Sequence, residues 1–65
     1  MPLKAALDLV MRDLEYSGRL TIRWLPICES LRQPVIAYAE KHGLIINYGK
    51  TIEPTLKGLN YIKNQ

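Results

Sequence analysis

The chain has 65 residues, of which 48% are apolar, and this composition suits one small folded domain and excludes a disordered chain. Nine basic and six acidic side chains leave a formal net charge of +3, an excess that permits anionic partners without requiring them. Cys28 is the only cysteine, so no disulfide can form within the chain, and no apolar run is long enough to span a membrane. We therefore expect a cytoplasmic protein without a membrane segment.

Residues 3–16 predict the first helix, because apolar side chains recur at every third or fourth position. This stripe consists of Leu3, Leu7, Val10 and Leu14, and Ala6 and Met11 widen it. Gly18 follows at a position that suits the left-handed backbone conformation in which helices often end.

Residues 19–31 carry a weaker pattern. Leu20 and Ile22 alternate with polar neighbours, which favours a short extended piece over residues 19–21, although Thr21 is equally suited to cap a helix. Pro26 argues against one unbroken helix through this segment. We expect a compact second helix that ends near Leu31.

Residues 33–42 predict a third helix, with Pro34 in its first turn and Gly43 just after its end. A hairpin is expected next: residues 44–47 are rich in strand-forming side chains, residues 48–50 form a turn, and residues 51–53 pair back. Pro54 ends the second strand, because proline has no backbone N–H to donate. Thr55 is expected to cap a last helix, in which Leu56, Leu59 and Ile62 share one face.

Three short motifs occur along this order of elements. They are Leu20-Thr21 before the second expected helix, Gly43-Leu44-Ile45 after the third, and TLKGLNYI over residues 55–62 after the hairpin. Together with the element order, they resemble the winged helix-turn-helix superfamily, especially small prokaryotic, archaeal and mobile-element regulators. The resemblance implies one α+β domain over residues 1–65, with a three-helix core, a short β-hairpin wing and a C-terminal helix.

In that superfamily the third helix enters the major groove of DNA and the wing meets the backbone. The resemblance thus implies a transcriptional regulator that binds double-stranded DNA, and we expect it to be a homodimer. Arg32 and Gln33 are suited to base edges, and basic side chains nearby are suited to phosphates. The candidate DNA-binding residues lie on the third helix, the wing and the segment after the first helix: Arg32, Gln33, Tyr38, Lys41, Lys50, Arg19 and Arg23.

A second interpretation stays open, namely a winged-helix protein–protein interaction module that does not bind DNA. The expected wing is minimal, and the third helix offers few side chains that form hydrogen bonds with bases. This interpretation predicts an exposed apolar patch that includes Trp24, Tyr38 or Tyr48. Trp24 is otherwise expected to pack partly in the core, as are Tyr61 and the small Cys28 side chain.

The sequence contains no pattern typical of an enzyme. It has no paired-carboxylate signature, no glycine loop that would cradle a phosphate, and no set of metal ligands at the usual spacing. His42 stands alone at a helix end, where interaction with the helix terminus is expected. We therefore expect no catalytic residue, cofactor or metal.

Overall fold

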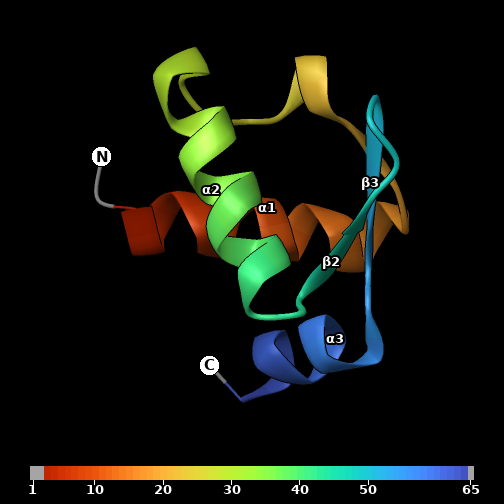
Figure 1. The fold of residues 1–65 in the computed structure, drawn as a ribbon. Helices are drawn as coiled ribbons and strands as arrows, with labels where there is room; N and C mark the ends of the chain where they lie inside the picture. The colour runs from red at the N-terminus through yellow and green to blue at the C-terminus, as the bar shows by residue number, and fades with distance from the viewer. Residues whose placement is uncertain (1–2, 65) are drawn as a thin grey trace.

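A computed structural model describes residues 3–64 and contains three α-helices and a three-stranded antiparallel sheet (Figure 1). The elements are α1 (Leu3–Ser17), β1 (Leu20–Thr21), the 3₁₀ turn η1 (Ile22–Trp24), α2 (Glu29–Lys41), β2 (Ile45–Asn47), β3 (Thr51–Pro54) and α3 (Leu56–Lys63). β3 lies between β1 and β2 in the sheet. The expected α+β class is confirmed.

The helix α1 is the centre of the core and contacts both other helices and the sheet. Its apolar stripe follows the helical period, so one face is fully covered while the opposite face meets solvent. Gly18 ends the helix as expected: its φ is +80°, and its N–H donates to the Leu14 carbonyl at 2.7 Å. The buried side chains of α1, each at most 2% exposed, are Ala6, Leu7, Val10, Met11 and Leu14.

Between β1 and α2 the structure differs from the sequence-based expectation. The second α-helix is replaced by η1, a single 3₁₀ turn closed by the Leu25 N–H, which donates to the Ile22 carbonyl at 3.3 Å. Leu25 is extended, with ψ 142°, because the ring of Pro26 disfavours the helical conformation of the residue before it. Consequently, a single α-helix, α2, lies between β1 and the hairpin, where the sequence had predicted two.

The helix α2 runs through Pro34 without a break, so the expected helix boundary between residues 31 and 33 is wrong. Pro34 cannot donate to the carbonyl of Ser30, but both residues are exposed, and water can satisfy that carbonyl. The opposite face holds the helix to the core. Its buried side chains are Val35, Ile36 and Ala39.

The hairpin forms as expected from the local sequence. β2 pairs with β3 in a register that sets Ile46 opposite Glu53. The turn is tightened by Asn47, whose side-chain oxygen accepts from the Gly49 N–H at 2.7 Å, and Gly49 has φ +92°. The hairpin turn and η1 lie together at one end of the molecule, and α3 lies at the other end (Figure 1).

Thr55 fixes the start of helix α3 to Gly43, which lies just before β2. The Thr55 hydroxyl accepts from the Gly58 N–H at 3.0 Å and donates to the Gly43 carbonyl at 2.6 Å, so the expected cap is confirmed. The expected apolar face is only partly right. Ile62 packs against the core, whereas Leu56, the first residue of the helix, is 76% exposed.

Candidate nucleic-acid interface

An open groove of about 410 Å³ lies between η1 and the hairpin turn, and we call it the hairpin groove. Its two sides are joined by the backbone: the Ile22 N–H donates to the Lys50 carbonyl at 2.9 Å, and Thr21 pairs with Thr51 in the sheet. These contacts hold the groove at a fixed width. It is lined by Thr21, Ile22, Arg23, Trp24, Gly49 and Lys50.

The side chain of Trp24 is 75% exposed, so the expectation that it packs partly in the core is wrong. The reason lies in the 3₁₀ geometry, in which residues three apart share a side. Ile22 and Leu25 take the inner side of η1, and Ile22 is half-buried while Leu25 is buried. Arg23 and Trp24 are therefore turned outward; the available signal in the sequence was Pro26, which limits the preceding segment to one turn.

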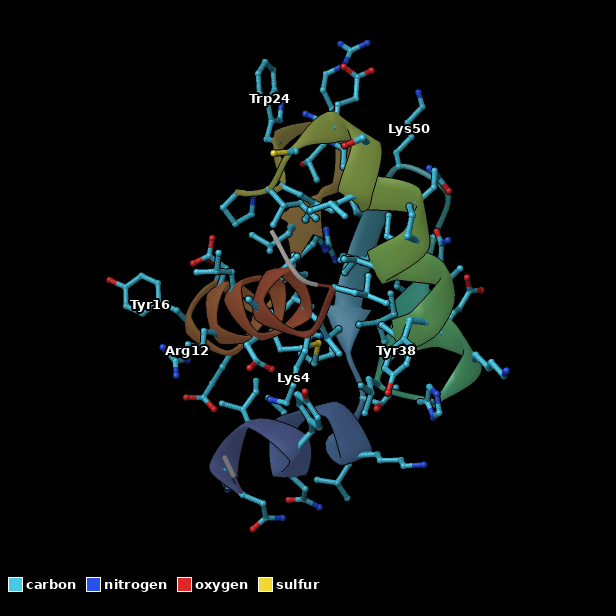
Figure 2. All side chains as sticks on the ribbon, turned by 90° about the vertical axis from the view of Figure 1, so that its left-hand side faces the viewer. Lys4, Arg12, Tyr16, Trp24, Tyr38 and Lys50 are labelled. Atoms are coloured by element: carbon cyan, nitrogen blue, oxygen red, sulfur yellow. The ribbon has the colours of Figure 1, made fainter. Side chains whose placement is uncertain are left out.

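Two positive charges border the exposed indole. The ion pairs found within residues 3–64 are Lys4–Asp8 and Arg19–Glu53, so no described acid neutralises Arg23 or Lys50. Trp24 and Lys50 project from the same end of the molecule (Figure 2). This end can attract an anion and can also offer it an aromatic face.

Two other predicted DNA-binding side chains lie elsewhere. The Arg19 guanidinium is 2.9 Å from the Glu53 carboxylate, so its charge is already paired. Tyr38 lies well away from Trp24 and Lys50 (Figure 2), where it lines a second groove together with Lys4 and other residues of α1 and α3. The structure therefore brings together only Arg23 and Lys50 among the basic residues predicted outside α2.

The predicted residues on α2 are divided between its two faces. Arg32 is half-buried, and its Nε atom is buried without a hydrogen-bond partner within residues 3–64. Gln33 and Lys41 are exposed, but so are the acids Glu29 and Glu40 on the same helix. The outward surface of α2 is thus not basic, and the DNA-binding role of its residues stays a prediction.

A hydrogen-bonded cluster ties α1 to α3 at the other end of the molecule. Asp8 accepts from the Tyr61 hydroxyl at 2.8 Å and from the Lys4 ammonium at 3.1 Å. Burial by itself would raise the pKa of Asp8, but these two hydrogen bonds and the charges of Lys4 and Arg12 together lower that pKa below its ordinary value of 3.8. The expectation that Tyr61 packs is confirmed, and the cluster has a structural role.

The single cysteine and the single histidine both lie at ends of α2. Cys28 is exposed just before the helix, so the expectation that it is buried is wrong. Its backbone is extended there, which turns the residue out of the core. His42 ends the helix and its ring lies 4.2 Å from that of Tyr38. Within residues 3–64, no three histidine, cysteine or acidic side chains converge on a possible metal site.

Comparisons of the chain with protein-family models, curated proteins and solved structures find no match. The resemblance to winged-helix proteins therefore stays a prediction. Over the described residues, each helix is too short or too polar to cross a bilayer.

Proposed function

We propose that this chain is a small winged-helix protein that binds duplex DNA through the hairpin groove and the outward face of α2. The observation that carries the proposal is the pair of unneutralised cations, Arg23 and Lys50, that line one groove at the hairpin end. The order of elements is compatible with it, since α1, β1, α2 and the β2–β3 hairpin follow the order of helix, strand, helix and hairpin expected for that superfamily, with η1 where a second helix was expected.

In this proposal Arg23 and Lys50 contact phosphates, which position a protein on DNA without selecting a sequence. Gln33 and Lys41 on α2 face the groove of the duplex. The exposed Glu29 and Glu40 oppose close approach to phosphates, so α2 adds little to the affinity. Binding is therefore weak, depends mainly on charge and falls steeply with salt.

The test is fluorescence anisotropy with a labelled random-sequence duplex, repeated from about 50 mM to about 200 mM salt. The double variant Arg23→Ala/Lys50→Ala is compared with Lys57→Ala/Lys63→Ala, which removes two positive charges from α3 at the opposite end (Figure 1). Both variants have the same net charge, so a difference between their DNA affinities depends only on where the removed charges lie.

We expect the groove variant to reduce the slope of log affinity against log salt by about 2, because each lost phosphate contact contributes about 0.9. The α3 variant should keep nearly the slope of the unmodified protein. Equal losses in the two variants would show that net charge alone matters and would overturn the assignment to the groove. Absence of duplex binding at low salt would overturn the proposed function.

The second candidate function is protein–protein interaction without DNA binding. The observation that favours it is the exposure of two aromatic side chains on η1 and the hairpin, Trp24 at 75% and Tyr48 at 58%. Aromatic residues at such positions are enriched in protein interfaces. The same titration separates the two functions, because a surface used only for proteins would leave the duplex unbound at every salt concentration.

A further inference from the structure

We propose that the hairpin groove accepts an unpaired DNA base, which stacks on Trp24 while Arg23 and Lys50 contact the flanking phosphates. This inference rests on the proposed DNA binding and adds a preferred substrate, a duplex that carries a single-stranded segment. It follows from the combination of an exposed indole, two unneutralised cations and apolar walls in one groove.

The indole is the feature that duplex binding does not use. Inside a duplex the faces of the bases are covered by their neighbours, so away from the duplex ends Trp24 has no aromatic surface to contact. An unpaired base exposes its face, and stacking of one base on an aromatic side chain contributes about 1–3 kcal/mol. Because every base has such a face, the site would tolerate different sequences.

The shape of the groove suits a single nucleotide. Its volume of about 410 Å³ falls within the range of roughly 300–1,000 Å³ that small-ligand sites have. Ile22 provides an apolar wall beside the indole. Gly49 on the hairpin side has no side chain, and the space that a Cβ would occupy is open, so the rim is clear for a sugar–phosphate backbone.

The two positive charges of the groove favour a nucleic-acid strand as its ligand over an uncharged or basic peptide segment. Arg23 and Lys50 come from η1 and the hairpin turn, so they lie on the two sides of the groove. A strand that crosses the groove would place successive phosphates near the two cations, with the base between them. Such binding combines counterion release with stacking, as is typical of single-strand sites.

Trp24 is the only tryptophan in the chain, so tryptophan fluorescence, excited selectively over that of the four tyrosines, reports on this groove alone. Three DNA ligands are titrated: a blunt duplex, the same duplex with a short 3′ thymine overhang, and that duplex with an overhang of abasic residues. The abasic overhang keeps the phosphates and removes the bases, so it separates stacking from charge.

We expect the thymine overhang to quench Trp24 and to bind about 5- to 150-fold more tightly than the abasic overhang. This range is the stacking contribution of about 1–3 kcal/mol per base converted at 1.4 kcal/mol per tenfold change. Trp24→Ala should abolish this preference for the thymine overhang, whereas Trp24→Tyr should retain part of it. The side chain is largely exposed, so both variants are expected to fold.

The possible failures are distinguishable. Equal affinity for the thymine and abasic overhangs, without quenching, would overturn the stacking site while the proposed duplex binding stands. A Trp24→Ala variant that keeps the preference for the thymine overhang would also overturn it, because the base would then not stack on the indole. No binding to any of the three ligands would overturn both proposals.

Discussion

Replacement of Gly58 by alanine should destabilise the domain, although the same change stabilises most helices. At an ordinary helical position alanine is favoured over glycine by about 0.8–1.0 kcal/mol. Gly58 is buried where α3 crosses the start of the hairpin, and an added Cβ would overlap the carbonyl oxygen of Leu44. It would also lie 2.9 Å from Met11 Cε and 3.1 Å from the Leu44 carbonyl carbon.

The expected cost follows from these contacts. Met11 Cε is the end of a flexible side chain and can move aside, but carbon atoms pack at about 3.5–4.0 Å, so the backbone contact with the Leu44 carbonyl carbon must open by roughly 0.4–0.9 Å. Overpacking of this kind costs about 1–3 kcal/mol, and a displaced α3 also weakens the hydrogen bond from the Thr55 N–H to the Leu44 carbonyl, now 3.0 Å long. We expect a net loss of about 2 kcal/mol or more, against a total stability of roughly 3–5 kcal/mol for a core this small.

The assay is urea unfolding followed by far-ultraviolet circular dichroism, which reports helix content. Trp24 is largely exposed and therefore a poor probe of folding. The matched control is Asn60→Ala, an exposed position in the same helix, which should change the unfolding free energy by no more than about 0.5 kcal/mol. If Gly58→Ala raises the urea midpoint, α3 does not approach Leu44 as closely as described and the reasoning is refuted.

Three smaller effects are expected. Thr55→Ala removes the helix cap and should lower the unfolding free energy by about 1–2 kcal/mol in the same urea assay. Asp8→Asn should cost about 1–2 kcal/mol at neutral pH, measured by thermal melts across a pH series. Because the folded pKa of Asp8 lies below 3.8, its contribution is present above about pH 4 and is lost as the pH falls through the folded pKa. Arg19→Ala, which breaks an exposed ion pair with Glu53, should cost no more than about 0.5 kcal/mol.

Each of these effects has a control variant or an outcome that would contradict it. Thr55→Ser keeps a hydroxyl at the cap and should retain most of the stability lost in Thr55→Ala. The Asp8→Asn variant should show a shallower decline in stability below pH 4 than the unmodified protein, and an equal decline would show that other groups control acid unfolding. A cost above about 1 kcal/mol for Arg19→Ala would indicate that its ion pair is less exposed to solvent than the structure shows.

Elements whose signals are local were predictable from the sequence. The stripe along α1 and the stop at Gly18 depend on neighbours within a few positions, and so do the tight turn at Gly49 and the Thr55 cap. For these elements, backbone geometry and hydrogen bonding inside one segment determine the structure. They account for most of the α+β architecture.

Elements that depend on distant contacts were not predictable in the same way. Whether α2 breaks at Pro34 depends on the burial of its opposite face, which holds the helix together despite one missing hydrogen bond. Whether Trp24 is buried depends on how many turns fit between β1 and Pro26, and only one 3₁₀ turn fits. At Pro34 and at Trp24 alike, the rest of the fold overrides or limits the structure that the local sequence favours.

The amino-acid sequence by itself determined the positions of α1, the hairpin and α3 and which residues are chemically suited to anions, because residue type and spacing are properties of the chain. Only the tertiary structure decided which of those residues meet. Arg23 and Lys50 are far apart in sequence and share a groove because β1 pairs with β3, which brings η1 against the hairpin turn. The same folding pairs Arg19 with Glu53 and buries the Nε atom of Arg32, since strand pairing and core packing are contacts between distant segments.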